Sequence, residues 1–77
     1  MKSIPDLIAY YRRRAVECGE EVDSVVERFN DGSNFYRQDD PDSQERARKH
    51  AAQWREEQSI ARDTASYLET LQARLPA

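Results

Sequence analysis

Hydrophobic residues recur over the first thirty positions with the period of an α-helix. They follow alternating steps of four and three for nearly four heptads: Ile4, Ile8, Tyr11, Ala15, Cys18, Val22, Val25 and Phe29. This spacing places one apolar stripe along one side of a helix. Ser3 supplies an N-cap hydroxyl and Pro5 favours a first turn, so the helix should begin at about residue 4. It should end near Asn30, because Asp31-Gly32 tolerates a left-handed terminus.

A second helix is predicted over about residues 41–75, after a connection over 31–40. Asp40-Pro41 has the character of an N-cap and first helical position, and Pro76 cannot continue a helix. The stripe of this helix is weaker and contains small residues: Ala47, Ala51, Trp54, Gln58, Ala61, Ala65, Leu68, Leu71 and Leu75. Alanine lets two helices approach closely, which suits the bulkier stripe of the first helix.

Charge patterning predicts that the two helices pair antiparallel. Residues 2–14 hold four basic side chains and one acidic, whereas residues 17–27 hold five acidic and no basic ones. Residues 44–55 hold four basic against one acidic, and residues 56–69 four acidic against one basic. An antiparallel hairpin brings each block beside a block of opposite sign, which selects that orientation. We therefore expect an all-α fold: one coiled-coil-like helical hairpin over residues 1–77, with Trp54 beside Gly19.

Surplus apolar side chains predict that two hairpins associate. Leu71 and Leu75 extend past the start of the first helix in this register, and three more large side chains lie beside the main stripe: Tyr10, Ile60 and Tyr67. A single hairpin of this size buries little apolar surface. We expect a homodimer that forms an antiparallel four-helix bundle through these five residues.

Composition narrows the class of protein. The 77-residue chain is 38% hydrophobic and 35% charged, with a formal net charge of −3, and its mean hydropathy is −1.03. It contains no apolar run long enough for a membrane span and no apolar signal-peptide core. The single cysteine excludes an internal disulfide and fits a reducing compartment, so a cytoplasmic protein is expected.

The sequence contains no combination of residues that predicts catalysis. A run of carboxylates occurs in the first helix, at Glu17, Glu20, Asp23 and Glu27, but the segment expected to face it is basic and adds no second acidic pair for Mg²⁺. His50 is the only histidine, and no glutamate precedes it by three residues as a di-iron bundle requires. Cys18 is interpreted as a core residue rather than a nucleophile. We expect a non-enzyme with no metal, cofactor or small-molecule substrate.

Two basic clusters make nucleic-acid binding the alternative function. They are Arg12, Arg13 and Arg14 in the first helix, and Arg46, Arg48 and Lys49 in the second. Helical dimers can bind RNA or DNA through such residues. Against this, the net charge is negative, and consecutive arginines spread around a helix.

The favoured function is a protein–protein interaction module that inhibits, tethers or regulates a larger protein. The connection contains Phe35, Tyr36 and Arg37, residue types that dominate binding hot spots. The alternative for Phe35 or Tyr36 is that its ring folds back onto Phe29 and closes the open end of the hairpin. Acidic side chains at Glu17, Glu20 and Glu21, with Asp39, Asp40 and Asp42, could engage a basic patch on the partner. Small size and acidic composition are typical of inhibitor proteins from phages and other mobile elements.

Overall fold

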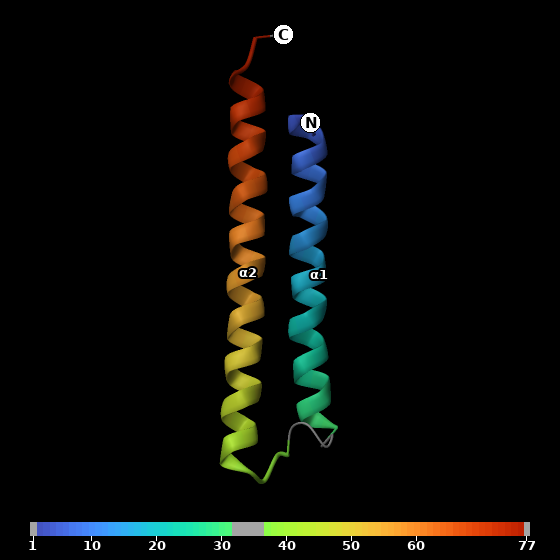
Figure 1. Cartoon of the computed structure of the whole chain (residues 1–77), viewed down its shortest axis with the longest axis vertical. Coiled ribbons are helices and arrows are strands. Elements are labelled where there is room, and N and C mark those ends of the chain that lie inside the picture. Colours follow the sequence, from blue (N-terminus) through green and yellow to red (C-terminus); the bar gives the residue numbers. More distant parts are fainter. Residues whose placement is uncertain (1, 32–36, 77) are drawn as a thin grey trace.

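The computed structural model describes residues 2–31 and 37–76, which form two long helices lying side by side (Figure 1). Helix α1 spans Ile4–Asn30 and α2 spans Pro41–Arg74, and the two run antiparallel. The hairpin is a rod of 58 × 18 × 14 Å. The predicted all-α hairpin is therefore confirmed, with helix bounds within one residue of those expected from the sequence.

The start of α1 is stabilised by a capping box. The Asp6 backbone N–H donates to Ser3 Oγ at 3.3 Å, and the Ser3 N–H donates back to Asp6 Oδ2 at 3.4 Å. Two backbone donors that the helix leaves unpaired are thereby satisfied. The predicted N-cap at Ser3 is confirmed.

Asp40 caps α2 and also orders its first turn. Its Oδ1 accepts from the Asp42 N–H at 3.1 Å, while its Oδ2 accepts from Ser43 Oγ at 3.1 Å. Arg46 Nη2 donates to the same Ser43 hydroxyl at 2.9 Å. Ser43 is only 1% exposed, and it extends the α2 stripe by one step before Ala47. Sequence reasoning missed it because an isolated serine is not a core signal.

The carboxyl end of α1 is closed by the side chain of Gln38. Its Nε2 donates to the carbonyls of Phe29 at 3.0 Å and Asn30 at 2.7 Å, and the backbone carbonyl of Gln38 accepts from Gln44 Nε2 at 2.6 Å. The C-cap residue Asp31 has φ −77° and ψ −6°, a right-handed conformation, so the left-handed terminus expected from Asp31-Gly32 is not found at Asp31. The side-chain amide of Gln38 thus satisfies two of the carbonyls that the end of α1 leaves unpaired.

Both predicted stripes face each other along the hairpin. Every α1 stripe residue is buried or half-buried, as are the α2 stripe residues through Leu68. Near the connection, Phe29 and Trp54 pack against a buried cluster of Val25, Ala47 and Ala51.

The relative register of the helices differs from the prediction by about one turn. A Cβ built on Gly19 would lie 2.6 Å from Gln58 Nε2, so Gln58 and not Trp54 lies against this glycine. The reason lies in the connection. Because Gln38 binds the end of α1, α2 begins beyond that end, as Figure 1 shows.

Neither α1 nor α2 has a stretch apolar enough, over the length that a bilayer requires, to be a candidate membrane span; this holds for the described residues.

Candidate interaction surfaces

The fully buried core of this hairpin consists of small side chains, and its large hydrophobic side chains are half-buried or exposed. Within the described residues, the buried hydrophobics are all alanine, cysteine or valine: Ala15, Cys18, Val22, Val25, Ala47, Ala51, Ala61 and Ala65. The exposed large hydrophobics are Tyr10, Val16, Val26, Ile60, Tyr67, Leu71 and Leu75. Contiguous exposed apolar surface on a small protein is a candidate interaction site.

All five residues predicted for self-association are exposed in the single hairpin. Ile60 is 53% exposed and Tyr67 is 67% exposed. Tyr10 is held at 5.1 Å from the Tyr11 ring in an edge-to-face arrangement, and Lys2 Nζ lies 4.8 Å from the Tyr10 ring centroid. Val16 and Val26 are further exposed apolar residues that the sequence analysis did not single out.

The hairpin has two broad faces, and the position of a residue relative to the buried stripe decides which face it joins. The side chain just before a buried residue points about 100° to one side of it. Because the helices are antiparallel, such residues from α1 and α2 share a face, here named the leading face. Its members Arg14, His50, Gln53 and Glu57 line one shallow hollow together with Trp54.

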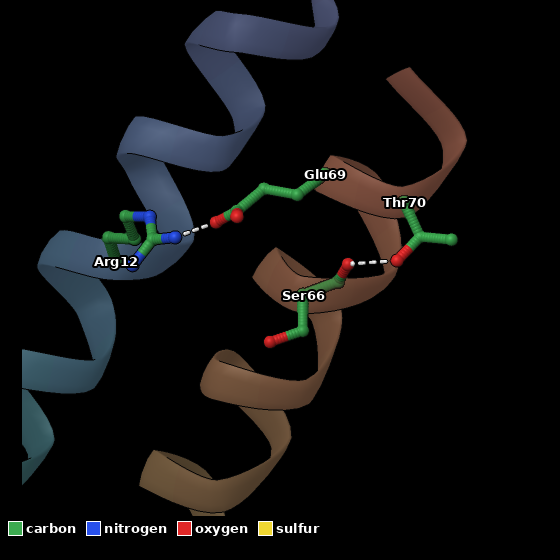
Figure 2. A network of polar contacts seen from close by, with 4 residues as sticks. All are labelled: Arg12, Ser66, Glu69 and Thr70. Atoms are coloured by element: carbon green, nitrogen blue, oxygen red, sulfur yellow. Dashed lines mark hydrogen bonds and ion pairs between the residues drawn. The ribbon is translucent and has the colours of Figure 1, made fainter. Parts of the chain in front are cut away.

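Residues just after buried positions form the opposite face, named the trailing face. Arg12, Val16, Arg62 and Ser66 line one hollow on it, between the two helices. Arg12 Nη2 forms an ion pair with Glu69 Oε1 across the helix pair, while the Thr70 hydroxyl donates to the Ser66 carbonyl (Figure 2).

Three arginines follow the trailing face of α2 at seven-residue spacing. Arg48, Arg55 and Arg62 lie about 10 Å apart along the helix axis. Small residues alternate with them at steps of four and three: Ala52, Ser59 and Ser66. This regular series is visible in the sequence but is less conspicuous there than the runs of adjacent basic residues.

A second, larger groove opens on the trailing face near the connection. Its walls include apolar Val25, Val26 and Phe29 from α1, and Arg48 and Arg55 from α2. The remaining lining residues are Asn30, Gln38, Gln44, Ala47 and Ala51. An apolar floor bordered by two guanidinium groups suits an apolar side chain flanked by carboxylates.

The structure does not unite the two predicted basic clusters. Residues 12–14 and residues 46–49 lie about 20 Å apart along the hairpin. Several members already have neighbours: Arg12 pairs with Glu69, Arg14 Cζ lies 6.0 Å from the Trp54 ring centroid, and Arg48 Nη1 lies 3.9 Å from Glu45 Oε2. Arg12 and Arg48 do share the trailing face, whereas Arg14 borders the leading face.

The predicted partner-binding residues also lie apart. Glu17, Glu20 and Glu21 are exposed, and even Glu21 is about 14 Å along α1 from the helix end at Asn30. Arg37 is exposed next to that end. Phe35 and Tyr36 lie outside the described residues.

Cys18 is completely buried, as expected for a core residue. Across residues 2–31 and 37–76, no group of three or more His, Cys, Asp or Glu side chains is arranged to hold a metal ion. The carboxylate run of α1 is thus spread along the helix without converging on one point.

Comparison with known proteins gives no relative from which a role could be transferred. No family model matches the chain, and neither the curated proteins nor the solved structures include a significant match. The geometry of the hairpin itself is therefore the basis for proposing a function.

Proposed function

We propose that this chain is a non-catalytic protein-binding module that regulates or inhibits a larger protein. The observation that carries the proposal is the distribution of apolar residues: a core of small side chains with tyrosine, isoleucine, leucine and valine on the outside. A helical rod with such a surface can dock preformed, without ordering a flexible segment.

The groove near the connection is the proposed contact for the foreign partner. It combines apolar Val26 and Phe29 with Arg48 and Arg55, and the hydrogen bonds of Gln38 hold its end in place. An aliphatic or aromatic anchor on the partner would enter the groove, with an acidic group beside it bound by the arginines. The exposed Arg37 would add a contact from the connection.

Self-association into a four-helix bundle is the second part of the proposal. The radius of gyration is 16.9 Å, against about 11.5 Å for a compact domain of 77 residues. An isolated rod leaves much apolar surface in water, and pairing two rods removes it.

The proposal is tested by affinity capture from the source cells, using the tagged chain and two charge variants. Arg48→Glu with Arg55→Glu should abolish retention of a defined partner, because it reverses both charges at the groove. Lys49→Glu with Arg62→Glu changes the net charge equally at two residues that do not line the groove, and it should retain that partner. Equal capture by all three proteins would exclude the groove as the binding site.

A nucleic-acid-binding regulator is the second candidate, favoured by the arginine series. Arg48, Arg55 and Arg62, with Arg12 nearby on the same face, could contact successive phosphates. Retention on duplex DNA or RNA that falls steeply with salt, and is lost when these arginines become glutamate, would support it. No retention at low salt would remove this candidate.

A further inference from the structure

We infer that the leading face, in the half near the free ends, binds a second copy of this chain antiparallel, with the two-fold axis at the level of Tyr10 and Tyr67. The inference rests on the proposed self-association and specifies its face, direction and register. Two independent patterns, one on each helix, lead to it.

The first pattern is an apolar stripe along α2, continued by its C-cap residue Leu75, whose outer members oppose one another when the stripe is reversed. Ile60, Thr64, Tyr67, Leu71 and Leu75 follow steps of four, three, four and four, and all except the half-buried Thr64 are exposed. Thr64 Oγ1 donates to the Ile60 carbonyl at 2.7 Å, so its hydroxyl already has a partner within α2. When a second α2 lies antiparallel about the midpoint of the stripe, Ile60 meets Leu75 of the second copy, and Thr64 meets its Leu71. Leu71, which lies level with the first turn of α1 in the observed register, and Leu75 thereby gain apolar neighbours.

The second pattern is a charge series on the outer edge of the same face, formed by α1 and by Lys2, which precedes this helix. Lys2, Asp6, Arg13 and Glu17 alternate in sign around the exposed Tyr10. Reversal of this series opposes Lys2 to Glu17 of the second copy, and Asp6 to its Arg13. Every opposed pair then has opposite sign, and the two-fold symmetry makes each pair occur twice.

The tertiary structure places the centres of these two patterns at the same height. The charge series is centred between Ala9 and Tyr10, and the apolar stripe between Tyr67 and Leu68. Gly19 lies against Gln58 in the hairpin. The centre of the charge series is as many residues from Gly19 as the centre of the apolar stripe is from Gln58, and both lie toward the free ends of the hairpin. A single two-fold axis can therefore pass through both centres. The sequence of either helix alone does not require the two centres to coincide.

The exposed area is sufficient for such an interface. The hairpin exposes 6041 Å², whereas a compact monomer of 9.0 kDa exposes about 4,900 Å². The difference, about 1,100 Å² per chain, exceeds the roughly 800 Å² per partner that a standard stable interface buries. A second copy of this chain both supplies opposite charges along the α1 edge and covers an area of this size.

Sedimentation equilibrium of the full chain tests the inference through a charge swap within α1. Arg13→Glu with Glu17→Lys keeps the net charge and leaves opposite charges at this i, i+4 spacing, but it opposes like charges across the proposed interface. We expect the dimer dissociation constant to rise at least about tenfold, since four exposed pairs are reversed. Adding Lys2→Glu restores one pair per copy and should recover part of the affinity. The matched control, Glu45→Arg with Arg48→Glu, lies near the connection and should change the constant less than about twofold.

An apolar test uses two exposed residues on opposite faces. Ile60→Glu should abolish the dimer, while Val16→Glu, on the trailing face and 60% exposed, should preserve it. Circular dichroism on the same samples shows whether the hairpin stays helical. A wild-type chain that remains monomeric would overturn both self-association and this inference. A dimer insensitive to both the charge swap and Ile60→Glu would leave self-association intact and overturn the arrangement, and neither result bears on partner capture at the groove.

Discussion

Gly19 of α1 and Gln58 of α2 are in close apposition, because a Cβ on Gly19 would lie 2.6 Å from Gln58 Nε2. This contact marks the height at which one helix lies against the other. A glycine in the middle of a long helix costs about 1 kcal/mol relative to alanine.

Replacing Gly19 by alanine should stabilise the hairpin by about 0.5–1 kcal/mol. The atom that the new methyl meets is the far end of a flexible side chain, and the amide of Gln58 can rotate away. Gly19→Leu should instead destabilise it, because a longer side chain also meets Gln58 Cδ. Urea unfolding followed by circular dichroism measures both. A loss of stability in Gly19→Ala would mean that Gln58 is held rigidly in place.

Replacing Gln38 by alanine should lower the free energy of unfolding by about 0.5–1.5 kcal/mol. The variant loses the Nε2 donor that binds the Phe29 and Asn30 carbonyls at the end of α1. Gln53→Ala, in the exposed middle of α2, is the control and should leave stability nearly unchanged. Equal unfolding curves for Gln38→Ala and wild type would show that water replaces the cap at no cost.

Burial of charge in the stripe should be far more damaging than the same change on the surface. Val22 is 8% exposed and Val16 is 60% exposed on the same helix. Val22→Asp should cost about 3 kcal/mol or more, since a carboxylate would lose its hydration between the helices. Val16→Asp should cost less than about 1 kcal/mol, mainly through helix propensity. Thermal melts of the two variants compare them directly, and similar melting temperatures would contradict the observed facing of α1.

Cys18 should react with thiol reagents only when the hairpin opens. Its side chain is fully buried, so modification in native buffer should be much slower than in urea. Cys18→Ser should also destabilise the fold by about 1–3 kcal/mol, more than Cys18→Ala, because the hydroxyl would be buried without a designed partner. Rapid labelling under native conditions would show that the thiol is accessible.

The ends of both helices could be predicted because their signals are local. Ser3 and Asp6 form a capping box within four residues, and Asp40 caps the helix that begins at the adjacent Pro41. A residue and its hydrogen-bonding neighbour within one turn need no tertiary information. Gln38 was missed for the opposite reason: its acceptors lie eight and nine residues away, on a different element.

The buried stripes and the antiparallel direction were determined by the sequence alone, through the 3.6-residue period of the helix and the alternation of charge blocks. The register depended on tertiary structure, because charge blocks many residues long fit equally well after a shift of one turn. The contact of Gly19 with Gln58, which identifies the register, is visible only once the two helices are packed. The tertiary structure also determined which residues of α1 and α2 lie together on the leading and trailing faces. Ile60 and Tyr10 share a face only because the chain reverses, and Arg12 meets Arg62 across the helix pair for the same reason. A sequence lists such residues far apart or side by side, and only the packing of α1 on α2 determines which of them a partner would meet together.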